Sequence, residues 1–229
     1  MRAALAFMAA AACGRINMDN RPVDASPEGE ADADSRPKPL HRYRLSGSYS
    51  DEFGGPALTP HGGAFDRNGY RFKANEGLSL SGVMPVSVYT IDVVVATDDL
   101  TQWRKLIDFK ALAIEPGVYV NDAKFSFVER AESAGTPIIA QSLPVLRARE
   151  FTQLTIVRAA NAKITGYIGR VPAFSIVDSF EAGTFTAAGS VVYFAMDDAQ
   201  TNRVEASSGN IRDIRIWNIA LTDAEVGAL

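Results

Sequence analysis

The chain has 229 residues, of which 47% are hydrophobic and 22% are charged. This composition is typical of a globular protein and excludes the fibrous and the wholly disordered classes. The formal net charge is −4 at pH 7, and Lys and Arg form no run longer than two residues. Such a chain has no basic field to hold a phosphate backbone, so nucleic acid is not an expected partner.

The first twelve residues, MRAALAFMAAAA, hold one Arg and then a short apolar run that ends on small side chains. The run is too short to span a bilayer and indicates a secretory signal. Cys13, the only cysteine of the chain, follows at once. This arrangement resembles a bacterial lipoprotein signal, which implies removal of residues 1–12 and lipid attachment to Cys13. The alternatives are a plain signal peptide or a mis-assigned start, with Cys13 a free thiol.

Residues 13–39 predict a disordered, acidic and proline-containing linker. From Gly14 to Pro39 the chain has six acidic residues, four basic residues, four prolines and no aromatic residue. This stretch is too polar to offset its ordering entropy by burial, so we expect a solvated tether. With a lipid anchor it would hold a domain at the bacterial outer membrane or cell surface; without one, the protein would be secreted.

Residues 40–229 have the pattern of short β-strands. In YTIDVVVAT, Tyr89 to Thr97, the apolar side chains alternate, and FTQLTIVRA, Phe151 to Ala159, places Leu154 and Ile156 opposite Gln153 and Thr155. Similar stretches recur at short intervals between Gly, Pro, Asn and Asp, and none of ten or more residues has a convincing helical period. The pattern predicts an antiparallel β-sandwich or barrel.

The chain ends in a predicted strand followed by one helical turn. In IRDIRIW, Ile214 and Ile216 share one face, and the other face brings Arg215 beside Asp213 and Trp217. TDAE then supplies a capping box, in which Thr222 bonds the amide of Glu225 and Glu225 reaches back. This stretch therefore closes the domain.

These stretches together resemble the laminin G-like, or concanavalin A-like lectin and glucanase, superfamily. The motifs that carry the resemblance are HRYRLSGSYSDEFGGPALTPHGG, GYRFKANEGLSLSG, RKLIDFK followed by GVYV, ITGYIGRVPAFSIVD and GNIRDIRIWNIALTDAEV. Arg212 stands where the family's closing pattern has an aspartate. The resemblance implies an all-β fold, a concanavalin A-like jelly roll of two antiparallel sheets with one short C-terminal helical turn.

The sequence holds no recognisable catalytic motif, so no catalytic residue is predicted. Retaining glucanases of this fold have a strand with the pattern Glu-x-Asp-x-x-Glu, which is missing from residues 40–229. The G-x-S-x-G, H-E-x-x-H, P-loop and G-x-G-x-x-G motifs are missing too. The only histidines, His41 and His61, cannot build a zinc site of several histidines, and we expect both on the surface or in turns.

Calcium is the expected inorganic partner, because laminin G-like domains often hold Ca²⁺ at the rim of the sandwich. FAMDDAQTNRVEASSG places Asp197, Asp198, Asn202 and Glu205 within nine residues, and hard cations prefer such oxygen ligands. Asp51, in the SDEFGG turn, is a second candidate. The same residues are ordinary turn formers, so a solvated loop is the alternative.

Trp103 is the candidate ligand-binding residue. The stretch DDLTQWRK places it in a predicted loop, where an exposed ring can stack on a sugar face; the alternative is that the ring packs over a sheet end. The favoured function is a surface-anchored, non-catalytic module that binds carbohydrate or an extracellular protein, with calcium assisting. The alternatives are a glycan-active hydrolase or lyase with an unrecognised catalytic pair, and a structural envelope lipoprotein.

Overall fold

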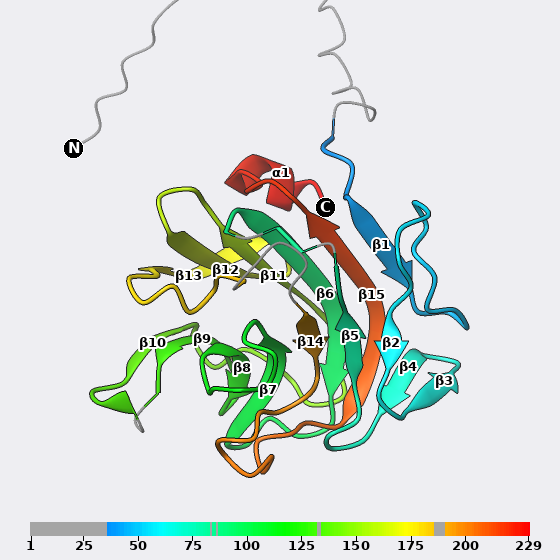
Figure 1. The fold of residues 1–229 in the computed structure, drawn as a ribbon, viewed down its shortest axis with the longest axis horizontal. Helices are drawn as coiled ribbons and strands as arrows, with labels where there is room; N and C mark the ends of the chain where they lie inside the picture. The colour runs from blue at the N-terminus through cyan, green and yellow to red at the C-terminus, as the bar shows by residue number, and fades with distance from the viewer. Residues whose placement is uncertain (1–35, 83, 86, 132–133, 186–190) are drawn as a thin grey trace, which may run out of the picture. The chain divides into compact units, whose positions relative to one another are not determined.

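Two antiparallel β-sheets, packed face to face, form the framework of the computed structural model (Figure 1). The described residues are 36–82, 84–85, 87–131, 134–185 and 191–229. The predicted signal, Cys13 and nearly all of the predicted linker lie outside them. Arg36–Leu229 forms one compact unit. The predicted sandwich is confirmed, and the fold is consistent with a jelly roll.

The first sheet has eight strands in the order β13-β12-β11-β6-β15-β4-β3, and β1 also pairs with β15. The neighbours β6 and β15 come from far apart in the chain and are its longest strands (Figure 1). Its members are β1 (His41–Arg44), β3 (Ala64–Asp66), β4 (Gly69–Phe72), β6 (Tyr89–Thr97), β11 (Thr152–Arg158), β12 (Lys163–Ile168), β13 (Val171–Val177) and β15 (Gly209–Trp217).

The second sheet has seven strands in the order β10-β9-β8-β7-β14-β5-β2. Hairpin connections join β7 to β8 to β9 to β10, so this half of the sheet is local in sequence. Its members are β2 (Thr59–Pro60), β5 (Leu78–Leu80), β7 (Trp103–Asp108), β8 (Gly117–Asn121), β9 (Lys124–Arg130), β10 (Ile138–Gln141) and β14 (Val192–Phe194).

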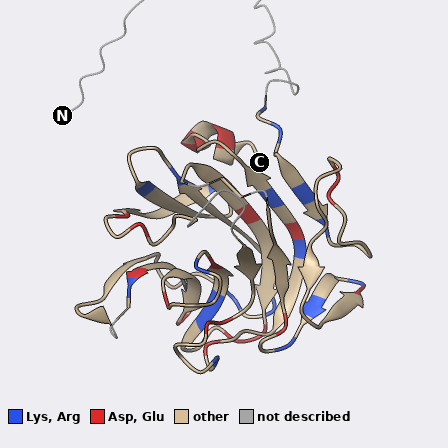
Figure 2. Ribbon diagram, in the orientation of Figure 1, with Lys and Arg blue, Asp and Glu red and all other residues tan. Residues whose placement is uncertain are grey.

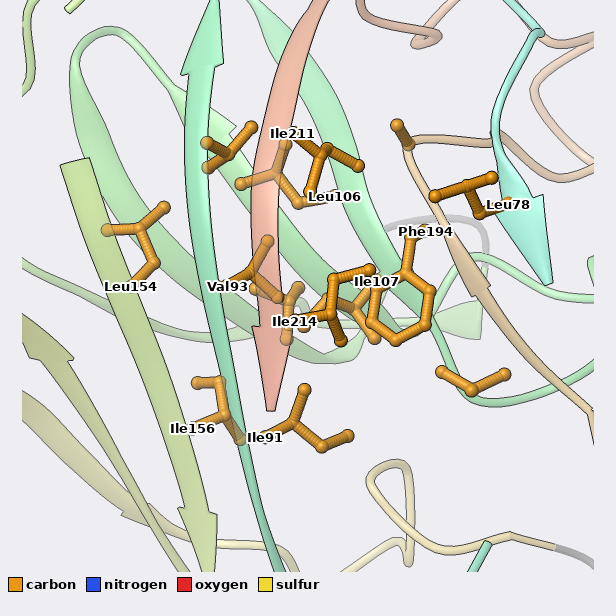
Figure 3. Close-up of a cluster of buried hydrophobic side chains, with 14 of the residues drawn as sticks. Leu78, Ile91, Val93, Leu106, Ile107, Leu154, Ile156, Phe194, Ile211 and Ile214 are labelled. Carbon is orange, nitrogen blue, oxygen red and sulfur yellow. The ribbon is translucent and has the colours of Figure 1, made fainter. Parts of the chain in front are cut away.

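The core lies between the two sheets. Figure 3 shows hydrophobic side chains of β6, β11 and β15 facing those of β5, β7 and β14. Burying one such side chain stabilises the fold by about 1.5–3 kcal/mol. The remaining gap beside Val93, Leu106 and Ile211 measures about 10 Å³, which leaves no room for an organic ligand. This gap is therefore not a ligand site.

The closing strand β15 has the predicted alternation, with different partners. Ile214 and Ile216 are fully buried in the core. Arg215 donates to Asp92 of the neighbouring strand at 2.7 Å, while its Nε lies 3.9 Å from Asp213, so the main partner comes from β6. Asp213 instead accepts from Arg42 of β1. Charged residues consequently mark β1, β6 and β15 in Figure 2.

Arg212 lies where the register of β15 against β6 shifts, and its guanidinium stacks over Phe151 at 3.7 Å from the ring centroid. After β15, α1 (Asp223–Gly227) begins with the predicted capping box of Thr222 and Glu225. Among the described residues, no helix has the length and apolar character needed to cross a membrane.

Candidate functional site

A groove of about 270 Å³ lies on the outer face of the seven-stranded sheet. Its floor is formed by Trp103, Tyr119, Val128 and Ile139, one side chain from each of the strands β7, β8, β9 and β10. Glu115 and Glu205 line it from two connecting segments. The groove thus combines an apolar, aromatic floor with carboxylates, which is a common composition of small-molecule sites.

Strand alternation places the floor residues on this face. Val118 and Val120 point into the core, so Tyr119 between them must point outward. In the same way Phe127 enters the core while Val128 joins the outer cluster. The four strands are joined by hairpins, so their outward side chains form one continuous surface.

Trp103 is half-buried and is the first residue of β7, not a residue of the loop before it. The edge of its ring meets Tyr119, with the ring centroids 5.5 Å apart and the planes at 85°. This T-shaped contact is a favourable aromatic geometry and fixes the orientation of Trp103. The ring therefore packs on the sheet, as the alternative interpretation had it, and still lines a groove.

Tyr119 fixes one wall of the groove as well as its floor. Its ring is buried, and its hydroxyl donates to the backbone oxygen of Glu115 at 2.5 Å. The amide of Glu115 in turn donates to Gln200 at 2.9 Å. Burial raises the pKa of the Tyr119 hydroxyl, so it remains a proton donor at every physiological pH.

Glu205 lines the groove as well. Its amide donates to Asp197 at 2.8 Å, and its backbone oxygen accepts from the amide of Lys105 in β7 at 3.0 Å. Burial, followed by the nearby charges of Asp197 and Glu115, raises the pKa of the Glu205 carboxyl to about 7. This carboxyl therefore changes charge near neutral pH.

A buried ion-pair triad lies behind the groove. The Lys105 ammonium donates to Asp198 at 2.6 Å and to the backbone oxygen of Ile114 at 3.1 Å, and it forms an ion pair with Asp108 at 2.8 Å. The Lys105, Asp108 and Asp198 side chains are 0% exposed. These contacts of the ammonium join β7 to the segments after β7 and β14.

The four residues proposed as calcium ligands do not converge. Asp197 and Asp198 are buried, and both accept bonds from within their own loop, Asp197 from Thr201 and Glu205, and Asp198 from Gln200. Asn202 is exposed, at a left-handed φ of 54°. Within the part of the chain that the structure describes, no three His, Cys, Asp or Glu side chains are placed to hold a metal.

These residues do not fit a calcium ion, because the Lys105 ammonium already occupies the carboxylate that would be central to it. The second candidate, Asp51, is also saturated. It is buried and accepts from the His41 ring at 2.7 Å and from the amides of Arg42, Phe53 and Gly55. Calcium therefore stays a prediction from the sequence, without support from these contacts.

The expectation for the histidines is wrong for one of them. His41 is 5% exposed, because β1 inserts beside β15 and Asp51 covers its ring. His61 is exposed and lies in the turn after β2, where its Nε2 meets Ser79 at 2.8 Å.

A second pocket, of about 360 Å³, adjoins the groove at Ala131, which lines both. Phe180 is 55% exposed here and stacks against the Arg130 guanidinium at 4.9 Å. Lys110 also lines the pocket, but its ammonium donates to the backbone oxygens of Glu181 and Thr184. No motif of the sequence predicts this pocket or the position of the Glu115 carboxylate, because both depend on how the loops pack.

Comparison with known proteins places the fold. Residues 72–227 match the Laminin_G_3 family model, described as the concanavalin A-like lectin/glucanases superfamily. The match runs from the end of β4 to the last residue of α1 and spans more than half of the chain. No curated protein matches the chain.

Several solved structures are similar. Domain 4 of AbnA, a GH43 extracellular arabinanase from Geobacillus stearothermophilus, in complex with arabinotriose, has a TM-score of 0.58 and 18% identity over 84% of this chain and 98% of that one. The Ruminococcus gnavus IT-sialidase CBM40 bound to α2,3-sialyllactose has a TM-score of 0.50 and 13% identity, over 63% of this chain and 82% of that one. The binding domain of botulinum neurotoxin serotype D has a TM-score of 0.60 and 10% identity, over 83% of this chain and 51% of that one. At these identities the likeness shows the shared fold.

Proposed function

The chain belongs to the concanavalin A-like lectin/glucanases superfamily, and from this premise we propose that it is a non-catalytic module that binds carbohydrate in the groove of Trp103 and Tyr119. The observation that carries the proposal is the combination of side chains there. Sugar rings present apolar C–H faces that pack on aromatic rings, and hydroxyls that donate to carboxylates. The groove offers both on one surface.

The structural neighbours support this direction. Two of them are described with bound oligosaccharides, arabinotriose and sialyllactose, and one as a sialidase carbohydrate-binding module. The neurotoxin neighbour is described as a binding domain. An extracellular protein remains a second class of partner for the same module.

A glycan hydrolase is the second candidate function, and one observation favours it. Glu115 and Glu205 line the same groove, and a carboxyl whose pKa is about 7 suits a general acid. The missing Glu-x-Asp-x-x-Glu strand argues for binding without turnover. Reducing-sugar release by the wild-type chain, lost in Glu205→Gln, would favour the hydrolase.

The proposal includes a place for the protein in the bacterial cell envelope. The signal-like residues 1–12 and Cys13 support a lipid anchor, and the polar stretch up to Pro39 supports a tether. Cys13→Ser should move the protein from the membrane fraction to the soluble fraction, and mass spectrometry should find acyl chains only on the wild-type protein. A wild-type protein without acyl chains would leave secretion as the alternative.

Titration with oligosaccharides tests the binding site. Hits from a glycan array of the full chain should bind Trp103→Ala about tenfold more weakly or worse, which corresponds to about 1.4 kcal/mol. Phe53→Ala is the matched control, because Phe53 is 53% exposed and does not line the groove. Equal binding by both variants would exclude this groove, and an array without hits would favour the structural lipoprotein.

A further inference from the structure

The charges that face the groove have one sign. Two side chains of its lining, Glu115 and Glu205, carry a carboxyl group, and no Lys or Arg is among the described residues that line it. Further acidic residues lie behind Glu205, because Asp197 accepts its amide and Asp198 is next in the chain. A ligand in this groove therefore meets a negative field.

A buried cation, Lys105, lies behind the groove and is held by acidic partners. The Lys105 ammonium lies 5.4 Å from the centre of the Tyr119 ring, is paired with Asp108 and Asp198, and donates to the backbone oxygen of Ile114. Its two carboxylate partners, Asp108 and Asp198, outnumber it, so the triad is itself negative when both are ionised. With no exposed surface, Lys105 is not available to pair with a ligand anion.

We infer that the groove accepts uncharged sugars and rejects sugars that carry a carboxylate or a sulfate, with Glu205 as the residue that sets this preference. The inference rests on the proposed function, since it names the substrate class of the same site. An anionic sugar placed here would lose hydration and gain no cation, while its charge would lie beside carboxylates at short range. A neutral sugar has hydroxyls that donate to these same carboxylates, which are strong acceptors.

The adjoining pocket, which Lys110, Arg130 and Phe180 line, is the place where an anionic sugar could bind instead. The Lys110 ammonium there donates to backbone oxygens. The Arg130 guanidinium donates through its Nε to the backbone oxygen of Thr136 and lies over the Phe180 ring. Binding at this pocket would not depend on Glu205. An Arg130→Gln variant therefore separates the two pockets.

The test compares the full-length wild-type chain with Glu205→Gln on an array of neutral, carboxylated and sulfated oligosaccharides, including arabinotriose, lactose and sialyllactose. At pH 8.5 Glu205 is charged, because its pKa is about 7. Wild type should favour the neutral members at least tenfold over their anionic counterparts, and Glu205→Gln should reduce this ratio at least threefold. Glu150→Gln is the matched control, since it removes one exposed charge outside the groove and should keep the ratio.

The other outcomes are distinguishable. Anionic oligosaccharides that bind the wild type as well as neutral ones overturn the inference and leave the binding function intact. Anion binding that Arg130→Gln abolishes also overturns it, and assigns the site to the Phe180 pocket. Silence of the whole array contradicts the proposed function itself. A ratio that Glu205→Gln leaves unchanged removes Glu205 as the determinant.

Discussion

On the outer face of the eight-stranded sheet, Asp92 and Asp213 each lie against the guanidinium of a neighbouring strand, whereas on the seven-stranded sheet Glu205 lies beside other carboxylates. Two carboxyl groups, one near each sheet, differ in acidity. The Arg71 guanidinium lowers the pKa of Asp98, at the end of β6, while burial raises that of Glu205 to about 7. Paired charges of the first kind stabilise a fold, and uncompensated charges of the second kind cluster at functional sites.

The largest expected effect comes from the triad behind the groove. Lys105→Met leaves the buried carboxylates Asp108 and Asp198 without their cation, so the free energy of unfolding should fall by about 3–5 kcal/mol. Urea unfolding followed by fluorescence measures it. Lys124→Met, at the start of β9 and outside the triad, is the matched control. A loss below about 1 kcal/mol would contradict a structural role for the triad.

Urea unfolding of a variant that breaks an ion pair on the eight-stranded sheet tests the other side of the comparison. Asp92→Asn removes the charge that Arg215 pairs with, while the amide oxygen can still accept from Thr155. Because Arg215 is partly exposed, we expect a smaller loss, about 2 kcal/mol. A loss larger than that of Lys105→Met would reverse the ranking of the two faces.

A third effect is the pH dependence from Glu205. Between about pH 4.5 and pH 7, folded Glu205 holds a proton that the unfolded chain has released, so the free energy of unfolding falls as the pH rises. Because Glu205 is partly exposed, we expect about 1–2 kcal/mol. Urea unfolding at pH 5 and pH 8 should show this fall in wild type and a smaller one in Glu205→Gln. Identical pH profiles for wild type and Glu205→Gln would contradict the raised pKa of Glu205.

The smallest expected effect concerns calcium. Since Lys105 occupies Asp198 and amides occupy Asp197 and Asp51, excess calcium and chelator should give the same melting temperature. A calcium-dependent rise would restore the sequence-based prediction and would show that the loop of Asp197 rearranges around the ion. Asp197→Asn would then remove the rise.

The sequence alone predicted the features that depend on local pattern. The alternation of apolar residues predicted β6 with its bounds, Tyr89 to Thr97, and β11 with one residue too many at each end. The faces of β15 and the capping box at Thr222 were predicted in the same way. These features follow from the two-residue period of strands and from short-range hydrogen bonding, which neighbouring residues decide.

Tertiary structure decided the partners. Asp92 and Arg215 are 123 residues apart, Lys105 and Asp198 are 93 apart, and no spacing rule links such pairs. Trp103 was proposed from the sequence as a ligand-binding residue, which stays a prediction. Tyr119, Glu115 and Glu205 join it in one groove only when β7, β8 and two connecting segments pack together. The physical reason is that a strand pattern fixes which face a side chain takes, while strand order and loop packing fix what it meets there.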